Sequence, residues 1–313
     1  MSAIEDIVFV RYQVTDLDAA ENFATDFGMH RSARTASALY MRGAASSHHV
    51  YVAELGAEPR AVGFGMKVGS EVELQKLAAE TGRPVEENDE PGGGKRVRLV
   101  APGGHQVDVM WGLGAIPPLP VREPIDINPS SRRTRMNRTV RLAAGPAHVI
   151  RLGHVAVYTP NLAEAVSFYS NVLGMRVADT YYAGAPDNRI AAFMRCGLGQ
   201  RFTDHHTVAL VQAPKPGFDH ASFEVLDWDD LMIGHDHMQA VEKYKHSWGP
   251  GRHYDGSNIF DYWRDPFGHK LERYTDGDVV NDEYAPANSR LDPSDMRKVL
   301  AQWGPALSAD FLA

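Results

Sequence analysis

The chain has 313 residues, of which 43% are hydrophobic and 23% charged, and its formal net charge at pH 7 is -8. This composition is typical of a soluble globular protein with one large or two ordinary domains, and it argues against a nucleic-acid partner. The N-terminus lacks the features of a signal peptide, and no apolar run reaches the length of a membrane span. Because Cys196 is the single cysteine, we expect a cytoplasmic protein with no intrachain disulfide and a buried, unreactive thiol.

Residues 8–29 and 153–175 resemble each other. Each segment begins with a strand-like run and continues through a turn into an amphipathic helix that ends in Gly-Met. Asp16 and Asn161 stand at the expected helix N-caps. Farther on, GGHQVDVMW resembles FGHKLERY, which ends at residue 274. The sequence therefore predicts two homologous halves.

We predict an N-terminal domain over residues 1–112, a linker over 113–150, a C-terminal domain over 151–280 and a tail over 281–313 that serves as a lid or an interface. A short helix is expected around 293–303 within the tail. The linker is rich in proline and arginine, a composition that favours a solvated connection or a subunit contact over an anion site. Its arginines are Arg132, Arg133, Arg135, Arg138 and Arg141.

Two histidines and one carboxylate stand out in the second half: His154, His220 and Glu272. Two neutral imidazoles and a carboxylate can occupy one face of an octahedral metal ion and leave the opposite face open for substrate and dioxygen. In the first half, the repeat alignment places other residues at these positions. They are Phe9, Gly63 and Asp108. We therefore expect the first half to be a structural copy that holds no metal.

The stretch GRHYDGSNIFDYWRDPFGHKLERY at residues 251–274 resembles the type I extradiol ring-cleavage (catechol) dioxygenases of the vicinal oxygen chelate superfamily. The resemblance covers roughly residues 5 to 275 at the level of the repeat. It implies an α+β fold with two homologous halves of paired βαβββ modules. It also implies an Fe(II) enzyme, with Mn(II) as a possible alternative, that uses dioxygen to open a catechol ring into a muconic semialdehyde-type product.

Carried over residue by residue, the resemblance makes His154, His220 and Glu272 the metal ligands. His206 is expected on the dioxygen side as a proton donor, with His205 as the competing assignment. The same resemblance places two further residues beside the catechol hydroxyls, as orienting and proton-handling groups. They are His253 and Tyr262, and the motif also contains Asn258 and Asp265, which we interpret as supporting residues.

Other histidines are expected to have no catalytic role. We interpret His48 and His49 as surface residues, His235 and His237 as part of a solvated helix start, and His269 as structural. On a helix, residues two apart do not share a face, which argues against a metal site at the HxH pair.

Two other functions remain open from the sequence. One is a glyoxalase-like metal-dependent lyase or isomerase, and the other is a non-enzymatic small-molecule-binding protein on the same scaffold. The sequence also leaves open whether the catechol substituent is an alkyl group, an aryl group or a carboxylate. Three cations could bind a carboxylate, but we favour their interpretation as surface charges; they are Arg189, Lys215 and Arg252. A homo-oligomer is the usual expectation for such a protein.

Overall fold

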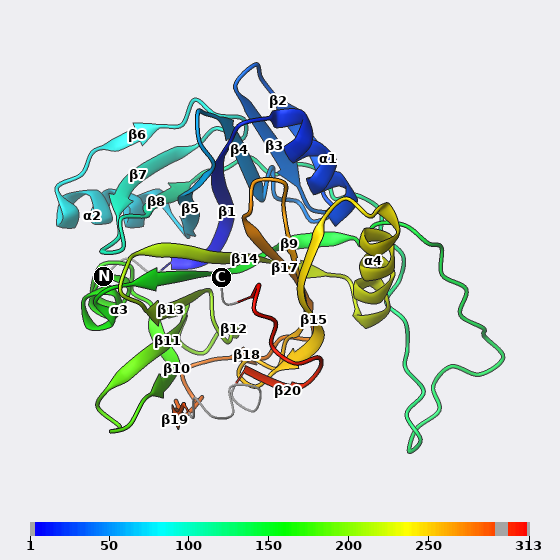
Figure 1. The fold of residues 1–313 in the computed structure, drawn as a ribbon. Helices are drawn as coiled ribbons and strands as arrows, with labels where there is room; N and C mark the ends of the chain where they lie inside the picture. The colour runs from blue at the N-terminus through cyan, green and yellow to red at the C-terminus, as the bar shows by residue number, and fades with distance from the viewer. Residues whose placement is uncertain (1–3, 292–299, 312–313) are drawn as a thin grey trace.

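The computed structural model describes residues 4–291 and 300–311. Two large sheets dominate it, one from each half of the chain, and Figure 1 shows the N-terminal half in blue and cyan above the C-terminal half in green to orange. Four βαβββ modules follow one another along the chain, two per half. The predicted α+β fold of two homologous halves is therefore confirmed.

The first half forms an eight-stranded sheet with the order β2-β3-β4-β1-β5-β8-β7-β6. Its strands are β1 Ile4–Val14, β2 His30–Arg34, β3 Ala38–Arg42, β4 Tyr51–Leu55, β5 Arg60–Val68, β6 Val85–Glu87, β7 Lys95–Val100 and β8 Gln106–Trp111. Its helices are α1 Leu17–Phe27 and α2 Glu71–Thr81.

The second half forms a ten-stranded sheet with the order β19-β10-β11-β13-β9-β14-β17-β16-β15-β20. Its strands are β9 Val149–Thr159, β10 Arg176–Tyr182, β11 Arg189–Arg195, β13 Val208–Gln212, β14 Gly217–Val225, β15 Lys245–His253, β16 Ile259–Arg264, β17 Lys270–Thr275, β19 Asn288–Arg290 and β20 Ala301–Trp303. A small sheet pairs β12 Thr203–Asp204 with β18 Val279–Val280. The helices are α3 Leu162–Asn171 and α4 Trp228–Val241.

Strand register supports the sequence alignment of the two halves. In the first half Phe9 pairs with Gly65, which pairs in turn with Asp108. In the second half His154 pairs with Ser222, which pairs with Glu272. The two sheets therefore place Phe9 opposite His154 and Asp108 opposite Glu272, as the alignment predicted.

Helix ends follow the predicted caps. The Asp16 side chain accepts from the backbone N–H groups of Asp18 and Ala19 at the start of α1. Asn161 accepts from the Glu164 N–H at the start of α3. Such side-chain acceptors satisfy N–H groups that have no partner inside the helix.

The two halves share one hydrophobic core. The ring of Tyr12 on β1 stacks on His269 with centroids 4.3 Å apart, and Phe27 at the end of α1 contacts Phe223 of β14. Backbone contacts join the halves as well, because Gly28 accepts a hydrogen bond from the Val149 N–H at the start of β9. The position of the metal-ligand candidates thus depends on both halves.

Residues 113–148 form a long connection with little regular structure, which projects at the right of Figure 1. The predicted domain limits stay a prediction, although β9 begins at Val149, two residues inside the predicted linker. After residue 280, β19 and β20 join opposite edges of the ten-stranded sheet. None of the helices in the described ranges has the length and apolar character of a membrane span.

One local prediction was wrong, and another is described only in part. His49 is only 4% exposed, because the loop between β3 and β4 folds its ring against Phe9 and Tyr40. Of the helix expected around 293–303, the structure describes residues 300–303, in which Leu300 is helical and Ala301–Trp303 form β20 along the edge of β15. Residues 292–299 of that expected helix lie outside the described residues.

Gly28 tests how closely the halves must approach. It closes α1 with φ 115°, and an added Cβ would lie 2.2 Å from the carbonyl oxygen of Ala147, just before the first strand of the other half. Gly82 closes α2 with φ 65°, and nothing lies within 4 Å of its added Cβ. We expect Gly82→Ala to cost roughly 1–2 kcal/mol for the left-handed backbone, and Gly28→Ala to cost roughly 1–3 kcal/mol beyond that for the steric clash. Urea unfolding of both variants measures the difference, and equal losses would contradict the close packing.

Candidate active site

His154, His220 and Glu272 come from three neighbouring strands of the central sheet, β9, β14 and β17. Their side chains converge. The His154 Nε2 lies 3.1 Å and the His220 Nε2 lies 3.4 Å from the same carboxylate oxygen, Glu272 Oε2. Metal bonds of about 2.1 Å at right angles would separate neighbouring ligand atoms by about 3 Å. The three side chains therefore have the spacing of ligands on one face of a metal ion.

The Glu272 carboxylate is fully buried, and among the described residues neither of its oxygens has a well-aligned hydrogen-bond donor. Burying a charged group without such partners is costly, and a metal ion is one of the few groups that can compensate for it. The residues therefore fit a divalent cation of the kind that the sequence predicts.

Protonation favours the same interpretation. Burial lowers the pKa of His154, so its imidazole is neutral and has a lone pair for a metal. Burial alone would raise the pKa of Glu272, but the contacts with His154 and His253 outweigh burial and hold this pKa well below its ordinary value. The site thus combines neutral imidazole and charged carboxylate, which are the forms that bind metal.

Asp219 supports His220, and the sequence reasoning missed it. One carboxylate oxygen, Oδ2, lies 2.8 Å from the His220 Nδ1. The other oxygen accepts hydrogen bonds from Lys270 Nζ at 2.7 Å and from the Tyr158 hydroxyl at 2.8 Å. Because a carboxylate accepts the Nδ1 proton, the Nε2 of His220 remains free to face Glu272.

The charge of Asp219 is maintained inside the protein. Burial would raise the pKa of Asp219, but the hydrogen bonds from His220 and Lys270 outweigh it and hold the pKa below its usual range. The Asp-His pair at 219–220 was a signal available in the sequence. However, the register shift in β14 between Phe218 and His220, which locally breaks the strand alternation, is visible only in the structure.

His206 rather than His205 reaches the metal-ligand candidates. The His206 ring lies 4.3 Å from that of His154, centroid to centroid, and it lines the cavity described below. The His205 Nε2 points instead to Asp179 Oδ2 at 2.8 Å. The two histidines contact each other through their Nδ1 atoms at 3.2 Å. The geometry therefore favours His206 for the dioxygen side, with His205 behind it.

His253 and Tyr262 form a hydrogen-bonded pair beside Glu272. The His253 Nε2 lies 2.8 Å from the Tyr262 hydroxyl, and its Nδ1 lies 2.8 Å from the Leu300 carbonyl oxygen. Since a carbonyl only accepts, the Nδ1 of His253 carries a proton and its Nε2 accepts from Tyr262. Burial, followed by the nearby Glu272 carboxylate, raises the pKa of Tyr262 well above its ordinary value, so the phenol stays protonated.

The supporting residues of the motif shape the backbone. Asp265 accepts from the backbone N–H groups of Phe267 and His269 at 2.9 and 2.8 Å, and it also contacts the His269 ring. These bonds hold the turn between β16 and β17. Asn258 is buried, and its carbonyl accepts from the His253 N–H at 2.8 Å. Asp265 and Asn258 lie outside the set of residues that line the cavity.

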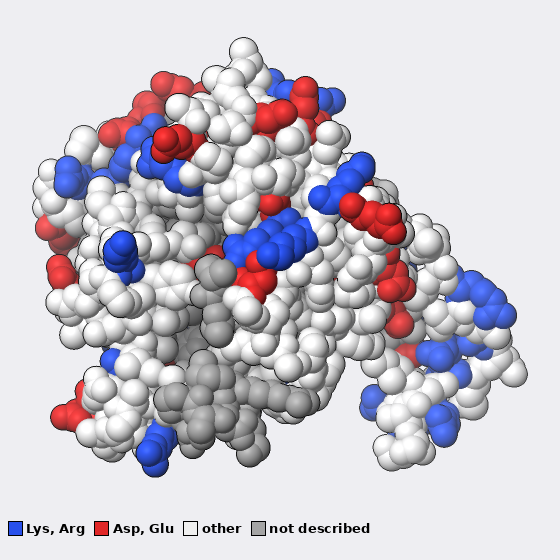
Figure 2. Space-filling model, in the orientation of Figure 1, with Lys and Arg blue, Asp and Glu red and all other residues white. Residues whose placement is uncertain are grey.

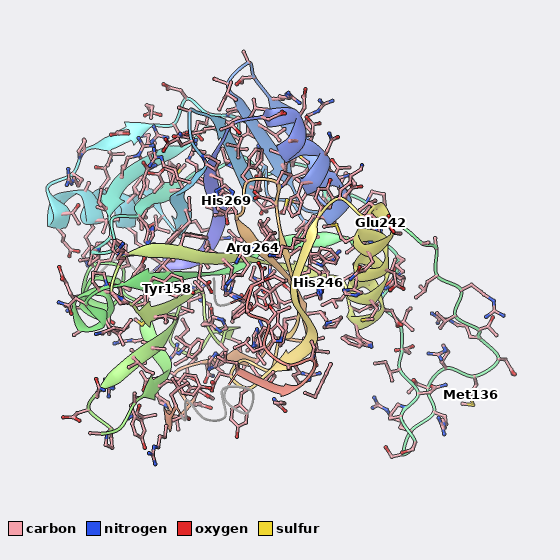
Figure 3. The ribbon with its side chains drawn as sticks, viewed as in Figure 1. Met136, Tyr158, Glu242, His246, Arg264 and His269 are labelled. Carbon is pink, nitrogen blue, oxygen red and sulfur yellow. The ribbon has the colours of Figure 1, made fainter. Side chains whose placement is uncertain are left out.

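The HxH pair does not mark a solvated helix start, and that prediction was wrong. Helix α4 begins at Trp228 behind the cap Asp227, so His235 lies inside the helix. The rings of His235 and His246 both contact Asp261 Oδ1, at 3.0 and 2.9 Å, and His246 lies beside α4 in Figure 3. The buried Arg273 guanidinium, 2.7 Å from Asp261 Oδ2, balances this carboxylate.

A cavity of about 290 Å³ opens in front of the ligand candidates. Its lining includes five of the six predicted site residues, namely His154, His206, His220, His253 and Tyr262. The sixth, Glu272, lies behind them with 0% exposure. Cys196 is fully buried in the hydrophobic core and takes no part in the cavity. The cavity has the size of a site for one small organic molecule.

Replacing Asp219 tests its role in metal binding. We expect Asp219→Asn to weaken divalent-metal affinity roughly 10–100-fold, because the amide no longer fixes the His220 tautomer. Tyr158→Phe removes a different hydrogen bond on Asp219 and leaves the His220 contact, so its effect should be smaller. Metal titration of both purified variants gives the comparison. Equal affinities for Asp219→Asn and the unchanged protein would exclude the proposed support.

Comparison with known proteins agrees with this geometry. Residues 151–272 match a family model described as the glyoxalase/bleomycin resistance protein/dioxygenase superfamily. Metapyrocatechase 2 of Cupriavidus necator is 29% identical over 99% of this chain and 92% of its own length. An iron-dependent extradiol dioxygenase of Rhodococcus jostii strain RHA1 is 32% identical over 42% of this chain and 45% of its own length.

Solved structures share the fold. A Mn(II)-bound glyoxalase from Novosphingobium aromaticivorans superposes with a TM-score of 0.80 at 23% identity, covering 100% of this chain and 95% of that one. Homoprotocatechuate 2,3-dioxygenase from Brevibacterium fuscum gives a TM-score of 0.79 at 20% identity, covering 99% and 92%. At these identities the likeness concerns the fold alone. Together, the comparisons show a chain with the glyoxalase, or vicinal oxygen chelate, fold, in which residues 151–272 match the model of the glyoxalase/bleomycin resistance protein/dioxygenase superfamily and whose relatives by sequence include proteins named metapyrocatechase and extradiol dioxygenase.

Proposed function

We propose that this protein is an Fe(II)-dependent extradiol dioxygenase, which inserts both atoms of O₂ into a catechol ring next to the vicinal diol. One observation carries the proposal. A small cavity is lined by the ligand candidates His154 and His220, with Glu272 buried behind them, and by the acid–base candidates His206 and His253. The product is a muconic semialdehyde-type compound, as expected in the catabolism of aromatic compounds.

The three ligand candidates would hold iron(II), which supplies open coordination positions for the two catechol hydroxyls and dioxygen. The same oxygen and nitrogen ligands accept Mn(II), so the metal that the protein carries depends on supply as well as on the site. The alternative glyoxalase-like chemistry is less favoured, because the first half has no suitable ligands at the equivalent positions. Phe9 stands at the position of His154. Asp108 stands at the position of Glu272, and it already pairs with Arg98 at 2.9 Å.

Tyr262 and His253 are placed to move a proton away from the catechol. The Tyr262 hydroxyl donates to the His253 Nε2, which leaves the phenol oxygen able to accept a hydrogen bond from a substrate hydroxyl. A proton can then pass through the Tyr262 oxygen to the His253 Nε2 without the formation of a phenolate, whose charge the buried site disfavours. The Leu300 carbonyl keeps the His253 Nδ1 proton in place during this transfer.

His206 is placed for the other proton transfer. Burial lowers the pKa of His206 well below its usual value, so its imidazole is neutral at rest. The Asp179 carboxylate accepts from the His205 Nε2, and this leaves the His205 Nδ1 as an acceptor for the His206 Nδ1 proton. The His206 Nε2 can therefore take up a proton and return it as the O–O bond breaks.

We also propose that the protein acts in the cytoplasm as a homo-oligomer, with no nucleic-acid or membrane partner. Support for self-association comes from the connection 113–148, whose projecting loop carries the exposed Met136 (Figure 3) and several arginines (Figure 2). Ile127 on the same loop is 67% exposed. Exposed apolar side chains on a projecting segment are typical of subunit contacts.

An assay of anaerobically purified, Fe(II)-loaded protein with catechol tests the activity. We expect a yellow ring-fission product and equimolar oxygen uptake. His154→Ala should lose the metal and the activity together. His206→Asn should keep the metal and lose roughly 10²–10⁴-fold in kcat, which is the usual contribution of an acid–base group. His237→Asn, whose ring contacts Asp26 outside the cavity, is the matched control and should retain activity.

Absence of product and oxygen uptake from iron-loaded protein with every catechol tested would contradict the dioxygenase proposal. Full activity of His154→Ala with bound metal would contradict the ligand assignment alone.

A further inference from the structure

The cavity has two chemically different sides. One side carries the metal-ligand candidates and the acid–base residues. The other is apolar and comes from β11, β13 and the chain after residue 280. Its side chains are Ile190, Ala191, Phe193, Ala209, Val211 and Leu291. Strand alternation explains this face, because Ala191 and Phe193 point into the cavity while Ala192 and Met194 point into the hydrophobic core.

The chain after residue 280 completes the apolar side. Leu300 and Phe311 both line the cavity, and Phe311 packs against the Tyr262 ring with centroids 4.9 Å apart. Trp248 closes the space between them, 4.8 Å from Phe311 by ring centroids. A catechol held by its hydroxyls at the ligand side would therefore direct a ring substituent toward aliphatic and aromatic carbon.

The charged side chains in the described lining of the cavity are acidic, so they do not favour an anionic substituent. Among the lining residues that the structure describes, none is lysine or arginine, whereas Asp219 and Asp255 are both present. The buried cation Lys270, which contacts two of the lining residues, is already engaged. Its Nζ lies 2.7 Å from Asp219 Oδ1 and 2.7 Å from the Phe311 carbonyl oxygen.

The three cations considered from the sequence lie elsewhere. Arg252 donates to the Ser257 carbonyl and pairs with Asp276 at 2.7 Å. Arg189 and Lys215 are exposed, and neither lines this cavity. An anionic substituent would therefore lose its hydration without gaining a partner, which is strongly unfavourable.

We propose that the substrate is a catechol with a compact neutral apolar substituent, an alkyl or aryl group, and that catechols bearing a carboxylate are poor substrates. This inference rests on the proposed dioxygenase function. The volume of about 290 Å³ lies just below the usual range for ligand pockets, which favours a short chain or a single ring over a long one.

A matched series of catechols tests the inference on Fe(II)-loaded protein. The series is catechol, 4-methylcatechol, 3,4-dihydroxybenzamide and 3,4-dihydroxybenzoate, in which the last two have nearly the same shape and differ in charge. We expect kcat/KM for 4-methylcatechol to exceed that for the carboxylate by at least about tenfold, with the amide in between. The corresponding 3-substituted pair, 3-methylcatechol and 2,3-dihydroxybenzoate, should show the same order.

Cleavage of catechol with equal or better cleavage of the carboxylates would overturn this inference and leave the dioxygenase proposal intact. Failure to cleave any catechol would overturn the dioxygenase proposal itself. Equal values for the amide and the carboxylate would also count against the charge argument, because shape alone would then explain the preference.

Two sets of variants separate charge from shape. Val211→Lys and, independently, Ala191→Lys add a cation to the apolar side, and at least one should shift the methyl-to-carboxylate ratio of kcat/KM toward the carboxylate by about tenfold or more. Arg297→Ala with Lys298→Ala removes two cations that lie outside the described residues. We expect the double variant to keep the ratio of the unchanged protein. A tenfold loss of activity confined to the carboxylate would show that a cation serves the cavity and would overturn the inference.

Discussion

The arrangement of the C-terminal half depends on one buried charge, the carboxylate of Glu272. It lies at the centre of the ten-stranded sheet with 0% exposure and with imidazole nitrogens 3.1 and 3.4 Å away. An isolated carboxylate in such a place would take up a proton, so the fold must supply positive charge or a metal ion to keep it charged. The neutral His154 and the tautomer of His220, fixed by Asp219, direct lone pairs at the same point, where a bound metal ion would supply this charge.

The two halves show how one backbone register serves two purposes. In each half, three adjacent strands bring one residue each to the same level of the sheet. In the first half one of these residues is Phe9, whose aromatic ring packs beside Gly65. A Cβ added to Gly65 would lie 2.4 Å from that ring. The carboxylate equivalent to Glu272 is Asp108, and it pairs with Arg98. The first half therefore satisfies its buried charge with a guanidinium and contributes packing to the shared core, while the second half keeps a space that a cation can fill.

The chain after residue 280 links the edge of the sheet to the chemistry of the site. Strand β20 pairs with β15, so the Leu300 carbonyl accepts a hydrogen bond from the His253 ring. Phe311 lines the cavity, and its backbone carbonyl accepts a hydrogen bond from Lys270. One segment thus fixes the proton position on a proposed acid–base residue and also supplies apolar surface for a substituent. The fold, the position of His253 and the substrate preference are therefore coupled through the same few contacts.

By itself, the sequence determined the repeat, the helix caps and the identity of the residues around the site, because these depend on local patterns and on a specific motif over residues 251–274. The adjacent histidines His205 and His206 could not be told apart with certainty from the sequence, since adjacent residues differ only in where the folded chain directs their side chains. The support from Asp219, the burial of His49 and the strand at 301–303 were missed for a related reason. Each results from contacts between segments distant in the sequence, such as Lys270 with Asp219 and β15 with β20, and only the packed tertiary structure decides which of these contacts form.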